Sequence, residues 1–285
     1  MTSSYLSGFR TALQRWPLAL ILFVASYVFG FGFSAGTWSW LSSALDKSLA
    51  TRTLLTDLDM NVFVDLFAHH GDSLWMLLVG GGLLAVVAWL LGVWLNAITI
   101  VAVGEELALS AAAHRALDVY ARFLRLGVIA LAADTLVVIV AVVVGRWLTR
   151  WTADSPSEMT FYAIVGASAL VVGVLMLWLT AVHDHARIHC AATGTGAVPA
   201  YLWALRFVVS GERRAVPLLA LLFVTGGAGW AVYQMVGILI ATNWIPGVVV
   251  SLVWGQLLML YRMFLRVWSL AAETELQSVN EDTGT

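Results

Sequence analysis

The densest group of side chains that could do chemistry is the run His183-Asp184-His185-Ala186-Arg187-Ile188-His189-Cys190. His185 and His189 lie one helical turn apart, and two imidazoles at that spacing can hold a metal ion. A third ligand would have to come from elsewhere, because Asp184 and Cys190 lie on other faces of the helix. The alternative, which we favour, is a polar helix end at which Asp184 pairs with Arg187 three residues later. No cofactor is predicted.

A second candidate is Asp134, the one carboxylate well inside an apolar run, with no basic residue within a helical turn of it. An unpaired carboxylate at such a depth indicates function, here a proton or cation relay. The alternative is a protonated acid that hydrogen-bonds to Gln234, Tyr233 or Gln256 on other helices. Asn96, Gln234 and Gln256 are the other polar residues of the apolar runs, and we expect them to form hydrogen bonds between helices.

A third candidate is Asp57-x-Asp59-x-Asn61, which resembles the start of a calcium-binding loop. It lacks the glycine of the sixth position, where Val62 stands, and the acidic residue of the twelfth, where Ala68 stands. A helix that begins at Asp57 or Asp59 explains the segment better, since its apolar residues recur at helical spacing. We expect this helix to lie on the outer face of a membrane.

The elements that must position these residues are membrane helices. Hydrophobic residues make up 61% of the 285, charged residues 11%, and the mean hydropathy is +0.88. A soluble domain carries about 25% charged residues, and a helix of roughly 20 apolar residues crosses a bilayer. Six runs qualify: Pro17–Trp40, Leu74–Val101, Leu126–Leu148, Phe161–Val182, Val216–Thr242 and Ile245–Leu265. The net charge of −2 argues against a nucleic-acid partner.

The basic residues predict the orientation of the runs. Eleven arginines fall on the side that holds both chain ends, and only Lys47, Arg52, Arg146 and Arg150 fall on the other side. Loops on the cytoplasmic side carry the excess of arginine and lysine. We therefore expect both termini in the cytoplasm, with the protein in the inner membrane of a bacterium.

The chain also repeats itself with a spacing of 84 residues. Matches in the apolar runs, such as Trp94 with Trp178, share this offset with Ala116, Arg122 and Phe123, which recur as Ala200, Arg206 and Phe207. The prediction is an all-α polytopic bundle of six transmembrane helices in three hairpin repeats with cytoplasmic interfacial helices. Its single domain spans residues 1–276, with repeats at about 5–103, 104–190 and 191–276, an outer-loop insertion at about 41–70, and a disordered polar tail at 277–285. The clearest interfacial helices are 111–124 and 198–209, and the expected interfacial anchors are Asp184, Arg187, Arg122 and Arg206.

Glycines within the runs have two interpretations. Gly32 and Gly36, Gly80–Gly82 and Gly226–Gly229 make these helices thin enough for close packing. The alternative is that they are hinges of a moving transporter. We favour packing.

The layout, with an Asp-x-Ala-Arg turn (Asp184, Ala186, Arg187) that closes the fourth run, resembles a broad set of uncharacterised bacterial six-helix integral membrane proteins. It is similar in style to the membrane region of some glycerophosphodiester phosphodiesterases. The resemblance covers the whole chain and implies no activity.

Three classes of function follow from the sequence. The first is a non-enzymatic structural, accessory or lipid-binding component of a membrane assembly, whose partners are lipids and other subunits that contact the loop 41–70. The second is a transporter of a small solute, ion or lipid that uses Asp134. The third is an enzyme, which would need a metal at His183–Cys190, and no known catalytic motif supports it.

Overall fold

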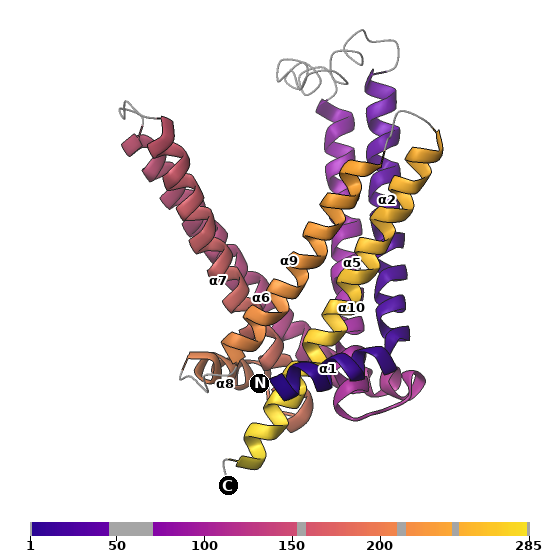
Figure 1. The fold of residues 1–285 in the computed structure, drawn as a ribbon, viewed down its shortest axis with the longest axis vertical. Coiled ribbons are helices and arrows are strands. Elements are labelled where there is room, and N and C mark those ends of the chain that lie inside the picture. Colours follow the sequence, from indigo (N-terminus) through magenta and orange to yellow (C-terminus); the bar gives the residue numbers. More distant parts are fainter. Residues whose placement is uncertain (1, 46–70, 153–157, 210–214, 241–244, 284–285) are drawn as a thin grey trace. The chain divides into compact units, whose positions relative to one another are not determined.

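The computed structural model describes residues 2–45, 71–152, 158–209, 215–240 and 245–283. In this part of the chain there are eight α-helices and no β-strand (Figure 1). The helices are α1 (Thr2–Gln14), α2 (Trp16–Leu45), α5 (Gly71–Gly104), α6 (Leu109–Thr152), α7 (Glu158–Thr193), α8 (Ala197–Val209), α9 (Ala215–Leu239) and α10 (Ile245–Thr283).

Six of these helices, namely α2, α5, α6, α7, α9 and α10, are long and apolar enough to cross a membrane. The prediction of an all-helical, multi-pass membrane protein is therefore confirmed. Some helices are longer than a bilayer requires. At 1.5 Å per residue, α6 with 44 residues is about 66 Å long, against a hydrocarbon core of roughly 30 Å. Part of α6 must therefore extend beyond the core.

Three boundaries differ from the predictions or cannot be compared with them. Residues 111–124 are not a separate helix but the first part of α6, whereas 198–209 falls within the separate short helix α8. The tail predicted as disordered from residue 277 is helical to Thr283, because α10 continues and buries Leu276 and Gln277. The predicted helix of residues 57–70 lies outside the described residues.

The chain divides into two compact units, of which the smaller comprises residues 21–92. Within it α2 and α5 pack against each other. A Cβ on Gly81 would lie 3.0 Å from the ring of Phe33, and one on Gly32 would lie 3.6 Å from Leu84. The indole nitrogen of Trp40 donates to the hydroxyl of Ser73, at 3.0 Å. Gly32 and Gly81 thus lie where the two helices pack.

The larger unit comprises residues 1–20 and 93–285. Its buried side chains gather near the ends of the spans: the last part of α5, the first parts of α6 and α9, the last parts of α7 and α10, and the short helices α1 and α8. Along the most apolar stretches of α6, α7, α9 and α10, by contrast, at most 17% of the residues are buried. The core of this unit therefore lies at the span ends.

Helix α1 lies against the C-terminal half of α10 (Figure 1). Tyr5 and Phe9 pack on the indole of Trp268, with ring centroids 4.6 and 4.8 Å away, and this indole donates to the Tyr5 carbonyl at 2.9 Å. Gly8 lies at the closest approach, where an added Cβ would be 2.7 Å from the backbone nitrogen of Ala272. Only glycine fits here without moving a helix.

Helix α9 packs on α10 through glycines as well. Gly226 faces Leu265, and a Cβ on Gly229 would overlap the ring of Tyr261, whose hydroxyl donates to the Thr225 carbonyl at 2.7 Å. These contacts fit the interpretation of Gly226 and Gly229 as packing positions, whereas a Cβ on Gly227 would meet nothing within 4 Å.

Candidate functional site: a buried polar cluster on α5, α7 and α10

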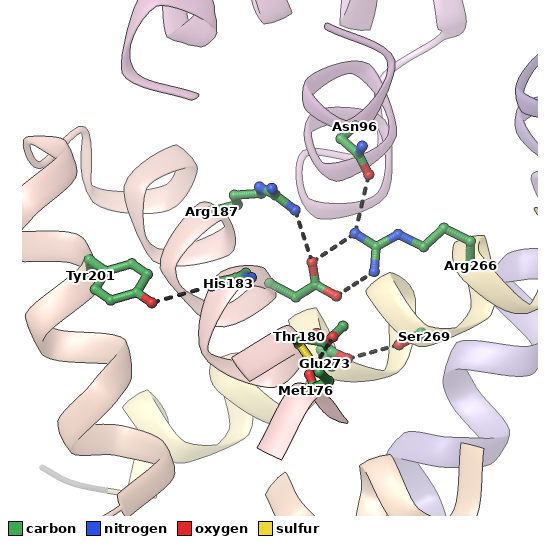
Figure 2. Close-up of polar contacts among 10 residues, drawn as sticks. Asn96, Met176, Thr180, His183, Arg187, Tyr201, Arg266, Ser269 and Glu273 are labelled. Atoms are coloured by element: carbon green, nitrogen blue, oxygen red, sulfur yellow. Dashed lines mark hydrogen bonds and ion pairs between the residues drawn. The ribbon is translucent and has the colours of Figure 1, made fainter. Parts of the chain in front are cut away.

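The carboxylate of Asp184, near the end of α7, is the centre of the polar interactions. Its side chain is 1% exposed, yet it accepts hydrogen bonds from both terminal nitrogens of Arg266 on α10. The Nη2–Oδ1 distance of this bidentate pair is 2.7 Å. Arg187 donates to the same Oδ1 at 3.3 Å (Figure 2). One buried carboxylate thus holds two guanidinium groups from two helices.

Asn96 connects a third helix, α5, to this pair. Its side-chain oxygen accepts from Nη2 of Arg266 at 3.2 Å (Figure 2). This is a hydrogen bond between helices, the role that the sequence predicts for Asn96. We call Asn96, Asp184, Arg187 and Arg266 the Asp184 cluster.

Two further polar side chains of α10 lie beside the cluster. Glu273 is 3% exposed and accepts a hydrogen bond from the Ser269 hydroxyl at 2.8 Å (Figure 2). Its other oxygen, Oε2, is buried without a hydrogen-bond partner in the described part of the chain. Sequence reasoning missed Arg266 as a partner and Glu273 altogether. The signal was the spacing of Arg266, Ser269, Glu273 and Gln277, which puts four polar residues on one face of α10.

Asp134 is not paired with the residues that the sequence suggested as its partners. It is half-buried on α6, and no hydrogen bond to Gln234, Tyr233 or Gln256 is formed among the described residues. Gln234 is exposed, and the side-chain oxygen of Gln256 is buried without a hydrogen-bond partner in the part of the chain described. The three expected partners therefore do not explain Asp134.

The groups near Asp134 belong instead to α7 and α8. His183 shares a hydrogen bond with the Tyr201 hydroxyl at 3.2 Å, with ring centroids 5.8 Å apart (Figure 2). Burial and the nearby charge of Asp134 raise the pKa of Tyr201, so its hydroxyl keeps its proton. The hydrogen bond between His183 and Tyr201 thus joins α7 to α8, and Asp134 on α6 acts on this pair through its charge.

The two histidines considered as metal ligands both contact α8. His185 is 1% exposed and packs on Phe207, with centroids 4.9 Å apart. His189 stacks on Trp203 at 3.9 Å, and its Nδ1 lies 3.5 Å from Nε2 of Gln277. In the described ranges no group of three His, Cys, Asp or Glu side chains is arranged to hold a metal. The geometry of these two residues is that of packing between helices.

The two other predicted anchors differ in their surroundings. Arg122 on α6 donates to the carbonyl of Gly194 at 3.0 Å. Gly194 follows the end of α7 with a positive φ of 70°, and its N–H bonds back to the Cys190 carbonyl. Arg122 therefore stabilises the C-terminal end of α7. Arg206 is exposed in the last turn of α8.

The Asp184 cluster is chemically self-contained. A cavity of about 180 Å³ lies among the ends of α5, α7 and α10, but Asn96, Asp184, Arg187 and Arg266 do not line it. Their charges are directed at one another. The arrangement can hold three helices in register.

Comparison of the chain with protein-family models, with curated proteins and with solved structures gives no match.

Proposed function

We propose that this chain is a non-enzymatic integral membrane protein, a structural, accessory or lipid-binding component of an assembly in a bacterial inner membrane. The observation that carries the proposal is the Asp184 cluster, in which charged groups of α7 and α10 pair with one another and with Asn96 of α5 rather than converge on a cavity. Buried ion pairs of this kind can specify how helices associate.

The surface of the spans supports the same role. Because few residues of α6, α7, α9 and α10 are buried along their apolar stretches, large side chains such as Leu170 and Val174 face outward. Exposed apolar surface at membrane depth contacts lipid or other membrane helices. This surface and the loop 41–70 are the proposed contacts with lipids and with other subunits.

Purification from bacterial membranes in a mild detergent, followed by mass spectrometry, tests the proposal. We expect the chain to carry stoichiometric partner subunits, and we expect a variant with residues 46–70 replaced by a Gly/Ser linker of equal length to lose them. A chain that purifies alone after crosslinking in intact membranes would contradict a role in an assembly.

The proposal includes an orientation with both termini, α1 and α8 on the cytoplasmic side, supported by the distribution of arginines. The proposal also includes the three hairpins as related repeats, with the short helices at the interface between membrane and water. Ser3→Cys, at an exposed position of α1, should react with a membrane-impermeant maleimide only after the cells are opened. Reaction in intact spheroplasts would reverse the orientation.

The alternative is a transporter that uses Asp134, favoured by the position of this half-buried carboxylate near His183 and Tyr201. In proteoliposomes that contain a pH-sensitive dye, a transporter of protons should collapse an imposed pH gradient. Asp134→Asn should abolish this flux while the protein still folds. If the wild-type protein leaves the gradient intact, the proton-transport alternative is wrong.

A further inference from the structure

Helices α1 and α8 have the same pattern of burial. Residues 4–13 of α1 and residues 200–209 of α8 match position for position in which side chains are buried, half-buried and exposed. Every fourth residue is buried, namely Ser4, Gly8 and Ala12 in α1 and Ala200, Ala204 and Val208 in α8. With this face α1 packs on the last part of α10, where Gly8 meets Ala272, and α8 packs on α7. The two short helices are therefore held to the protein in the same way.

Each of these helices leaves a second face exposed. Its three members are spaced at i, i+4 and i+7, so they lie on one side of the helix. They are Leu6, Arg10 and Leu13 in α1, which we call the α1 face, and Leu202, Arg206 and Val209 in α8, which we call the α8 face. The four aliphatic side chains are between 50% and 63% exposed. An exposed apolar face that carries a cation is typical of a helix that lies in the interface between membrane and water.

The chain holds both helices at the ends of membrane-spanning helices. Helix α1 ends at Gln14, and α2, which is long and apolar enough to cross a membrane, begins at Trp16. Trp16 is 58% exposed, and tryptophan at the end of a span marks the depth of the lipid headgroups. Helix α8 lies between two helices of membrane-spanning length, α7 and α9. Helix α1 also runs across the last part of α10 instead of alongside it (Figure 1). Both faces therefore lie near the level of the headgroups.

The order of side chains around α1 suits the surface of a membrane. At roughly 100° per residue, Arg10 falls between the two leucines of the α1 face and the polar residues Ser3 and Gln14. With the leucines in the apolar layer, the guanidinium reaches the phosphates and the polar side faces water. Arg10 forms no ion pair within the described residues, so its charge is available to a lipid phosphate.

We propose that the α1 face and the α8 face lie on anionic phospholipids, at the membrane surface on the side of both termini, where Arg10 and Arg206 contact lipid phosphates. This inference rests on the proposed function, because it names the lipid and the contact surface of a lipid-binding component. Two observations commit the faces to lipid rather than to a second protein. Both helices are attached to membrane helices at headgroup depth, and each places its arginine beside aliphatic side chains, which complements an anionic surface over an apolar layer.

Spin labels test which side of each helix meets lipid. Cys190, the chain's single native cysteine, is buried, so a nitroxide reagent attaches to introduced cysteines. In vesicles of phosphatidylcholine and phosphatidylglycerol, labels at Leu6→Cys and Leu202→Cys should be relaxed more by oxygen, which concentrates in lipid, than by a water-soluble nickel chelate. Gln14→Cys, the control on the polar side of α1, should show the reverse. Nickel access at positions 6 and 202, or protection from both reagents by a second protein, would overturn the proposal.

Native mass spectrometry of the full chain tests the preference for anionic lipid. The purified protein in detergent is incubated with equal amounts of phosphatidylglycerol and phosphatidylcholine. We expect phosphatidylglycerol to be retained about five times more often than phosphatidylcholine. Arg10→Gln with Arg206→Gln should remove this preference. Arg115→Gln, the control, changes an exposed arginine that is already paired with Glu105 and Asp118, and it should leave the preference unchanged. The same preference in the double variant as in the control would contradict the role of the two arginines.

A measurement on the unaltered protein covers the case in which a variant does not fold. In the same vesicles, phosphatidylglycerol with a photoreactive diazirine near its headgroup should crosslink to residues 2–14 and 197–209. Adducts confined to other helices would contradict the inference. If the adducts lie elsewhere but partner subunits still copurify, this inference fails and the proposed function stands. If no subunit copurifies and the adducts lie on α1 and α8, the role in an assembly fails and the lipid contact stands.

Discussion

The last part of α7 and the middle of the same helix show two ways in which a membrane helix is stabilised. From Leu179 to Cys190 most side chains are buried, and Asp184 makes ion pairs with two arginines. In the middle of α7, Leu170 is 70% exposed and Val174 is 58% exposed. In lipid, apolar side chains gain little by leaving lipid for a neighbouring helix. Specific packing therefore accumulates at the polar ends, where water is the alternative solvent.

The largest expected difference in stability is between a variant that removes a buried carboxylate and one that removes an exposed carboxylate. Asp184→Ala leaves Arg187 and Arg266 near the core without their carboxylate, which should cost about 3 kcal/mol or more. Asp118→Ala, the matched control, removes an exposed partner of Arg115 and should cost nothing measurable. Unfolding is followed by titration with a denaturing detergent, read by circular dichroism. Equal losses in the two variants would contradict the difference between the regions.

A second comparison uses one leucine in the buried core near the span ends and one leucine in the exposed middle of a span. Leu270 on α10 is fully buried, so Leu270→Ala should lose about 2–5 kcal/mol through lost contacts and a cavity. Leu170→Ala, in the middle of α7, faces outward and should lose less than about 0.5 kcal/mol. The same titration measures both. A larger loss at Leu170 would place the core in the middle of the spans.

A third comparison uses a glycine at a close helix contact and a glycine with open space around it. Gly8→Ala forces a Cβ against the backbone of Ala272, and the resulting shift of α1 should cost about 1–3 kcal/mol. Gly173→Ala, on α7 with open space around its Cβ position, should be neutral or stabilise the helix by up to about 1 kcal/mol. Melting followed by a thiol-reactive dye suits this pair, because Cys190 is the chain's single cysteine and is buried. Two variants with the same melting temperature would contradict the close contact of α1 with α10.

The smallest expected effect concerns α8. Tyr201→Phe removes the hydroxyl that bonds to His183 and should lower stability by about 1 kcal/mol. Tyr27→Phe, at an exposed position of α2, keeps the ring contacts of this residue, is the control and should change nothing measurable. The dye assay applies to both. A melting temperature unchanged by Tyr201→Phe would show that the hydrogen bond contributes nothing to the packing of α8.

Hydropathy predicted the six spans well because their length is imposed by the bilayer, and the pairing of Asp184 with Arg187 followed from a spacing of three residues within one helix. The partner Arg266 is 82 residues from Asp184, and no local pattern connects the two. For Asp134, the sequence indicated its depth in the membrane but not the direction in which its face of α6 points. Partners were therefore expected on α9 and α10 instead of α7 and α8. Local spacing determines which residues share a helix face, while tertiary packing determines what that face meets.

A double-mutant cycle on Asp184 and Arg266 tests most directly whether this ion pair holds α7 to α10. Asp184→Asn, Arg266→Gln and the double variant are unfolded in the same detergent titration. We expect that the single losses do not add, with a coupling energy of at least about 1.5 kcal/mol, because the two side chains form one bidentate pair. Losses that add to within about 0.5 kcal/mol would mean that the pair does not hold α7 to α10, and the structural role would be contradicted.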